Sequence, residues 1–182
     1  MNYTGYKQLV DEILDNPSPT APYDDDMYLD YTKLNRSRMK RWDKHSMLDG
    51  NLISRLQEIR SSQHWIIITE PWCGDAAHIV PFLIKMTEQS QYISYDIQLR
   101  DCEPFLIESY LTNGTRSIPK LIVRDETGND IFNWGPRPKG AQEIVDRMKA
   151  ANADFETTKI VLQNWYNNDK GVSLCKELIN YF

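Results

Sequence analysis

The sequence predicts a layered α/β fold with helices packed on a central sheet, and three observations lead to it. A continuous apolar run at residues 64–69 is typical of a strand that is covered on both faces. Apolar side chains at helical spacing follow over residues 75–88, and residues 92–99 alternate as a second core strand. A strand–turn–strand pattern over residues 120–134, with Thr127-Gly128 at the turn, predicts an antiparallel hairpin. The elements therefore form a parallel pair with a crossover helix, followed by the hairpin.

Helical segments flank this core on both sides. Apolar residues at helical spacing predict them over residues 6–14, 29–41, 48–60, 104–111, 139–150 and 155–181. The last helix is interrupted near Asn167–Gly171. The basic run Arg36–Arg41 is interpreted as the solvated face of its helix, and Asp24-Asp25-Asp26 as a turn or a helix start. The chain then has three parts, which are an N-terminal helical extension (1–62), an α/β core (63–150) and C-terminal helices packed on the core (151–182).

Composition and charge exclude several classes of partner. The chain has 182 residues, of which 41% are hydrophobic and 26% charged, with a formal net charge of -5. An acidic balance gives no electrostatic reason to bind nucleic acid or an anionic membrane. No apolar stretch approaches the roughly 20 residues that span a bilayer, and the first residues lack the apolar region of a signal peptide. We therefore expect a cytoplasmic protein whose three cysteines are thiols.

Cys73 is the candidate catalytic residue, because it stands between the first core strand and the helix that follows. A helix start leaves backbone N–H groups unpaired and carries partial positive charge, which stabilises a thiolate. We therefore expect an exposed and reactive thiol. Trp72 can shield the sulfur, and Gly74 leaves room for another chain to approach. Asp75 acts in the opposite direction, since a carboxylate disfavours a nearby thiolate, and the sequence leaves open which effect dominates.

These residues resemble the redox site of thioredoxins. Trp72-Cys73-Gly74 matches the start of the thioredoxin motif, Pro81 follows the cysteine by eight residues, and Ile118-Pro119 opens the hairpin strand. The resemblance spans residues 65–148 and implies a thioredoxin-like fold with N-terminal and C-terminal helical extensions. It also implies a cis peptide bond before Pro119, a backbone at Ile118 that pairs with an extended peptide, and no metal at the sulfur.

A narrower resemblance, to a bacterial thioredoxin-like family with the motif Trp-Cys-Gly-Asp-Cys, covers most of the chain. The matching segments are Leu34–Met39, Glu70–Asp75, Tyr110–Gly114, Ser117–Leu121 and Trp134–Pro138. The chain departs from this pattern at Ala76, which occupies the place of the second cysteine. A dithiol oxidoreductase needs that second thiol to release its partner from the mixed disulfide.

Three functions follow as alternatives. In the first, Cys73 forms mixed disulfides with a protein disulfide or a low-molecular-weight thiol, and an external thiol such as glutathione or bacillithiol resolves them. Trp72, Gly74, Asp75, Ile118 and Pro119 then bind the substrate, no cofactor is needed, and Cys102 is an alternative resolving thiol. In the second, the same groove binds a partner without turnover. In the third, Ala76 is an engineered replacement in an ordinary dithiol reductase.

Three other residues have alternative roles in or near the motif. His78 is interpreted as a solvent-facing side chain of the motif helix, and Cys175 as a core residue. Arg137 either belongs to a rigid corner between a strand and a helix or contacts an anionic group near the thiol. The corner is the preferred interpretation.

Overall fold

A four-stranded mixed sheet forms the centre of the molecule, whose computed structural model describes residues 1–182. The strand order is β2-β1-β3-β4, with β1 at Gln63–Thr69, β2 at Ile93–Leu99, β3 at Lys120–Arg124 and β4 at Asp130–Trp134. Strand β1 pairs parallel with β2 and antiparallel with β3, and β3 and β4 form an antiparallel hairpin. The predicted α/β fold with a parallel pair and a hairpin is thus confirmed.

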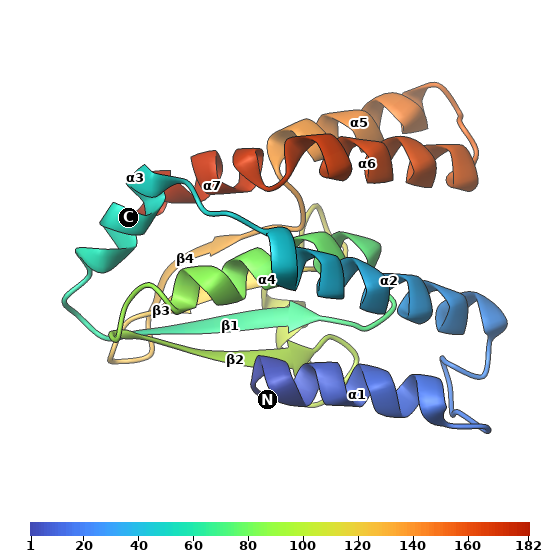
Figure 1. Ribbon diagram of the computed structural model, residues 1–182, viewed down its shortest axis with the longest axis horizontal. Helices are drawn as coiled ribbons and strands as arrows, with labels where there is room; N and C mark the ends of the chain where they lie inside the picture. The colour runs from blue at the N-terminus through green and yellow to red at the C-terminus, as the bar shows by residue number, and fades with distance from the viewer.

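Helices surround this sheet (Figure 1). They are α1 (Tyr3–Asp15), α2 (Asp26–His45), α3 (Gly50–Gln57), α4 (Gly74–Thr87), α5 (Lys139–Ala150), α6 (Phe155–Asp169) and α7 (Val172–Leu178), with short 3-10 turns η1 (Leu106–Ser109) and η2 (Ile179–Tyr181). The crossover helix α4 packs against α2, which also contacts α1, and α5 packs against α6. Asp25 caps the start of α2, so the acidic run begins a helix as expected. No helix combines the length and the apolar character needed to cross a bilayer.

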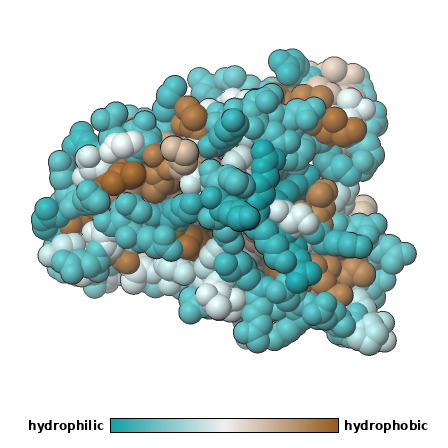
Figure 2. Space-filling model, in the orientation of Figure 1, coloured by the Kyte–Doolittle hydropathy of each residue, from teal (hydrophilic) through white to brown (hydrophobic).

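Helix α4 is buried along almost its whole length, because the sheet covers one side and α2 covers the other. Its core side chains include Phe82, which is 1% exposed and packs on the indole of Trp42 from α2. On the sheet side, Trp65 and Ile67 of β1 are fully buried. A helix that is apolar all round is typical of such a central position. The surface is mostly hydrophilic on the face in Figure 2, with hydrophobic residues in small separate patches.

Strand β2 lies at an edge of the sheet, so its description as a core strand is wrong in part. Only Ile93 and Ile97 are buried in it. The outer side of the strand is covered by the chain terminus, where the Met1 nitrogen donates to the Ile97 carbonyl and the Met1 carbonyl accepts from the Ile97 N–H, both at 2.8 Å. Alternation of apolar and polar residues is typical of a strand with one face buried and the other more exposed, which is the arrangement of β2.

One predicted helix is absent from the structure, and one predicted interruption is confirmed. The segment 104–111 forms only the four-residue turn η1, because Phe105 before it adopts a left-handed backbone with φ 52°. The predicted interruption near Asn167–Gly171 divides the segment 155–181 into α6 and α7, at Lys170 and Gly171, which are both left-handed. A Cβ at Gly171 would lie 2.2 Å from the ring of Phe82, so glycine alone allows α7 to approach the core at this break.

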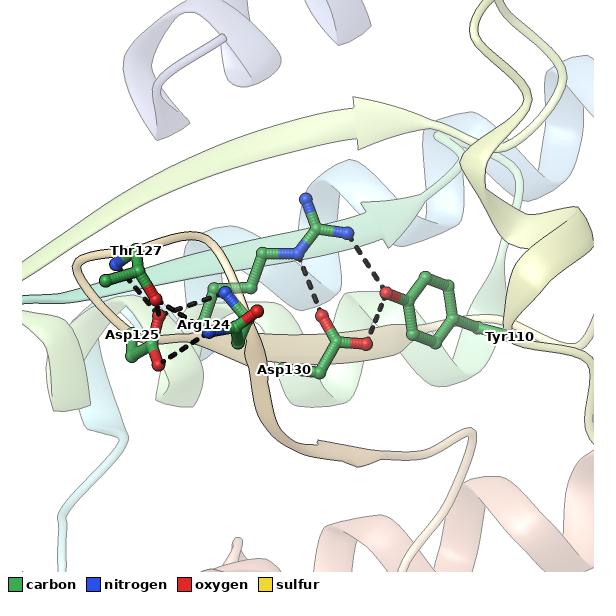
Figure 3. A network of polar contacts seen from close by, with 6 residues as sticks. Tyr110, Arg124, Asp125, Thr127 and Asp130 are labelled. Atoms are coloured by element: carbon green, nitrogen blue, oxygen red, sulfur yellow. Dashed lines mark hydrogen bonds and ion pairs between the residues drawn. The ribbon is translucent and has the colours of Figure 1, made fainter.

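A polar network joins the loop after η1 to the hairpin (Figure 3). Arg124 of β3 donates to the Asp130 carboxylate at 2.9 Å and to the Tyr110 hydroxyl at 3.0 Å. Tyr110 in turn donates to Asp130 at 2.5 Å, and this bond lowers the pKa of the Asp130 carboxyl. Asp125 accepts hydrogen bonds from Thr127 and organises the turn. The network anchors the start of the loop that leads from η1 to Ile118.

Candidate functional site

Cys73 caps the N-terminus of α4 and lies against the loop that precedes β3. Its Sγ accepts a hydrogen bond from the Ala76 N–H at 3.5 Å and donates to the Ile118 carbonyl at 3.4 Å. The peptide bond between Ile118 and Pro119 is cis. The fold therefore brings the two matched segments into contact across 45 residues of sequence. The expectation of an exposed thiol is wrong, because the Cys73 side chain is buried, with 7% exposed.

Burial and the nearby charge decide the ionisation of this thiol. Burial raises the pKa of Cys73 to about 12, and the Asp75 carboxylate contributes to this rise. The Ala76 N–H and the Arg137 guanidinium act in the opposite direction, with smaller effects. Cys73 is therefore a protonated thiol at neutral pH, and the question that the sequence left open is answered against the thiolate.

Asp75 is held from two sides at the start of α4. Its carboxylate lies 2.7 Å from the Arg137 guanidinium and accepts a hydrogen bond from the Tyr166 hydroxyl, also at 2.7 Å. These contacts use both carboxylate oxygens, and Asp75 is only 8% exposed. Arg137 thus contacts an anionic group near the thiol, and its interpretation as part of a corner only is wrong. The loop that carries Arg137 packs closely on the segment before β3 at Gly135, which has φ 124° and where a Cβ would lie 2.3 Å from the Pro119 carbonyl.

His78 is buried, with 4% exposed, so its interpretation as a solvent-facing residue is wrong. Its Nδ1 accepts from the Trp42 indole at 2.8 Å, and its Nε2 lies 3.1 Å from the Gln163 side-chain oxygen. The ring also stacks on Tyr166 at 4.5 Å. Burial, followed by the charge of Arg38, lowers the pKa of His78 to about 3. The neutral ring therefore joins α4 to both α2 and α6.

We expect His78→Gln to reduce the acid sensitivity of the fold. The folded-state pKa of His78 lies below the unfolded value of 6.5, so the unfolded chain binds the extra proton and stability is lost as the pH falls below 6.5. The wild type should lose up to about 1.4 kcal/mol per pH unit that the variant does not lose. Urea unfolding at pH 7, 6, 5 and 4 measures this. His45→Gln, which changes an exposed histidine, should follow the wild type, and a parallel pH dependence of His78→Gln would contradict the argument.

A cavity of about 650 Å³ opens over the thiol, and we call it the Cys73 cavity. The core supplies Trp72, Cys73, Gly74, Asp75 and Ile118 to its lining. Its other walls come from the two helical extensions, with Tyr28, Tyr31 and Arg38 from α2, and Phe155, Leu162 and Tyr166 from α6. The extensions therefore enclose the motif, and the sequence prediction, which placed the site in the core alone, missed them.

Arg38 is the residue that the sequence prediction misplaced most clearly, since it is half-buried in the cavity wall and not on a solvated face. Its Nη1 donates to the Asn35 side-chain oxygen at 2.8 Å, and the Asn35 amide donates to the Pro71 carbonyl at 3.0 Å. This chain of bonds ties α2 to the turn before Cys73. The signal was present in the segment Leu34–Met39, which contains both residues and belongs to the narrower resemblance.

Three other residues named from the sequence lie apart from the cavity lining. Pro119 is buried beside Ile118 but does not line the cavity. Cys102 is exposed, lies beyond β2 and does not line it either. Cys175 is buried in α7 with 3% exposed, as expected of a core residue. All three cysteines are free thiols, and no group of three or more His, Cys, Asp or Glu side chains is placed to hold a metal ion.

Comparison with known proteins identifies the fold family and little more. A family model described as Thioredoxin matches residues 21–149. A solved structure of a protein of unknown function from Pseudomonas aeruginosa is 18% identical, with a TM-score of 0.51 over 79% of this chain and 86% of that chain. An HIV epitope-scaffold is 16% identical, with a TM-score of 0.57 over 86% of this chain and 94% of that chain. No curated protein matches the sequence.

Proposed function

Since the chain belongs to the thioredoxin family, we propose that it uses the family's motif groove as a binding site without dithiol turnover. The observation that carries this proposal is the state of the motif. The only motif cysteine is buried and has a pKa raised to about 12, and a cavity of about 650 Å³ opens directly over it. A cavity of this size accepts a small organic ligand.

The thiol chemistry of a dithiol reductase has two requirements, and the motif falls short of both. The attacking group is a thiolate, yet a thiol with a pKa of about 12 is ionised in roughly one molecule in 10⁵ at pH 7. Release of the product needs a second thiol that attacks the mixed disulfide, and position 76 is alanine. The cavity walls from α2 and α6 serve binding without needing either group.

A single-cysteine reaction is the second candidate, and the position of the sulfur favours it. Cys73 caps α4, lines the cavity and accepts a hydrogen bond from the Ala76 N–H. This arrangement stabilises the thiolate that forms when the thiol loses its proton to solvent. The Cys73 thiolate would attack a disulfide sulfur, form a mixed disulfide and expel the other thiolate. A second, external thiol would then release the bound half.

The pH profile of Cys73 alkylation separates the two candidates. We expect labelling by iodoacetamide, followed by mass spectrometry, to have a midpoint well above the unperturbed thiol value of about 8.5. The exposed Cys102 should be labelled first and serves as the internal reference. The variant Cys102→Ser removes this thiol and should leave the labelling of Cys73 unchanged. A midpoint for Cys73 well below 8.5 would overturn the binding proposal and support the mixed-disulfide reaction.

A further inference from the structure

The charge of the Cys73 cavity is opposite to that of the whole protein. The chain has a formal net charge of -5, but the cavity lining has one carboxylate, Asp75, and five cations. The cations are Arg38, Arg100, Arg116, Arg137 and Lys159. A concave site lined by one sign of charge concentrates the potential of that sign and attracts ligands of the other.

Four of these cations are neutralised by carboxylates within the protein. The ion pairs are Arg100–Asp101, Arg116–Glu108, Arg137–Asp75 and Lys159–Glu156. Each of these four positive charges is thus largely compensated by its carboxylate partner. A ligand would therefore have to compete with a carboxylate at each of these four positions.

Arg38 is the exception, because no carboxylate lies within ion-pair distance of it. Its one hydrogen bond to another side chain goes to the neutral amide of Asn35, and its Nε is buried without a partner. The Nη1 atom lies over the motif, 3.3 Å from the point where a Cβ on Gly74 would stand. No hydrogen bond within the protein uses the Nη2 group of Arg38, so Arg38 has an unpaired charge and free N–H donors to bind an anion.

The rest of the lining is suited to an apolar body. Tyr28 and Tyr31 face the cavity from α2, and Phe155 and Leu162 face it from α6. Phe155 is 66% exposed, so a large apolar side chain in the cavity wall is accessible to a ligand. Trp72 completes this wall beside the thiol, with Tyr28 edge-on to its indole at 5.5 Å.

We propose that the Cys73 cavity binds a small amphipathic anion, whose single oxyanion group is held by Arg38 and whose apolar body lies against Tyr31, Phe155 and Leu162. This rests on the proposed binding function and gives it a ligand class. The ligand carries a carboxylate or a sulfonate, because one unpaired guanidinium matches one such group. Its apolar part is an aromatic or aliphatic unit that displaces water from the aromatic wall.

A pair of fluorescent probes that differ in charge tests the proposal. The anionic probe is 8-anilinonaphthalene-1-sulfonate, and its uncharged counterpart is N-phenyl-1-naphthylamine. We expect Arg38→Gln to lower the affinity for the anionic probe by about tenfold or more, because a charge-assisted hydrogen bond contributes that much to binding. The affinity for the neutral probe should not change. Arg41→Gln is the matched control, since Arg41 lies one turn further along α2, is exposed and does not line the cavity. It should bind both probes like the wild type.

Two further measurements locate the probe and guard against misfolding of the variant. Saturating anionic probe should slow alkylation of Cys73 and leave Cys102 unaffected. In the wild type, added salt should lower the affinity for the anionic probe only. Arg38→Lys should bind the anionic probe more tightly than Arg38→Gln does.

Equal effects of Arg38→Gln on both probes, or no effect on either, would overturn the anion site while leaving cavity binding intact. Absence of any protection of Cys73 would overturn the proposal as well. The binding function itself fails separately, through a low alkylation midpoint of Cys73 without any probe present.

Discussion

Asp75→Asn is expected to speed alkylation of Cys73 at pH 8 by about tenfold or more, since a neighbouring charge shifts a pKa by about 1–3 units. After burial, the Asp75 carboxylate is the largest cause of the raised thiol pKa. Tyr166 and Arg137 now hold different oxygens of the carboxylate, each at 2.7 Å, so the single asparagine oxygen can still accept from one of them. The Arg137 guanidinium would then act on the thiol without an opposing charge. The same variant therefore lowers the thiol pKa in two ways.

The midpoint of the pH profile is the quantity to compare, because it reports the pKa separately from the accessibility of the sulfur. Asp146→Asn is the control, since Asp146 lies on α5 and accepts a hydrogen bond from Gln142 on the surface. It should leave the profile of Cys73 unchanged. An unchanged midpoint in Asp75→Asn would mean that burial alone sets the thiol pKa, and the argument from Asp75 would fail.

Ala76→Cys is expected to raise disulfide reductase turnover to at least about tenfold above the wild-type rate, because it supplies the second thiol that releases the substrate. Ala76 lies in the first turn of α4, and its N–H is 3.5 Å from the Cys73 Sγ. Side chains three residues apart on a helix are neighbours, so the new thiol would stand within reach of the old one. The thiolate introduced at position 76 would attack the Cys73 sulfur of a mixed disulfide and expel the bound substrate as a thiolate.

Reduction of insulin disulfides with dithiothreitol as the electron donor measures this gain, and mass spectrometry detects the intramolecular disulfide. Ala76→Ser is the matched control, because it adds a group of similar size without a thiol to a position that is 1% exposed. Ala76→Cys combined with Cys73→Ser should also be inactive. A variant that forms the disulfide yet shows no turnover would contradict the expectation, and would mean that the enclosing helices α2 and α6 exclude protein substrates.

Local patterns were sufficient for most of the elements. The apolar run at 64–69 corresponds to β1 at Gln63–Thr69, and the helical spacing over 75–88 corresponds to α4. The hairpin over residues 120–134 is present, with its turn where predicted. These features depend on neighbours within about one helical turn or one hairpin, which a sequence reports directly. The prediction for 104–111 was wrong, because Phe105 adopts a left-handed backbone and only a four-residue turn follows. The break that the sequence predicted near Asn167–Gly171 occurs at Lys170 and Gly171.

The sequence by itself determined the α/β fold, the position of Cys73 at a helix start and the absence of a second motif thiol at Ala76. Only the tertiary structure decided whether Cys73 is exposed or buried, and whether it is a thiolate or a thiol. Its burial, the Asp75–Tyr166 bond across 91 residues and the approach of α2 and α6 to the motif all join segments far apart in the chain. The balance between a helix start and a buried carboxylate is set by distances and solvent exposure, and neither quantity exists until the chain has folded.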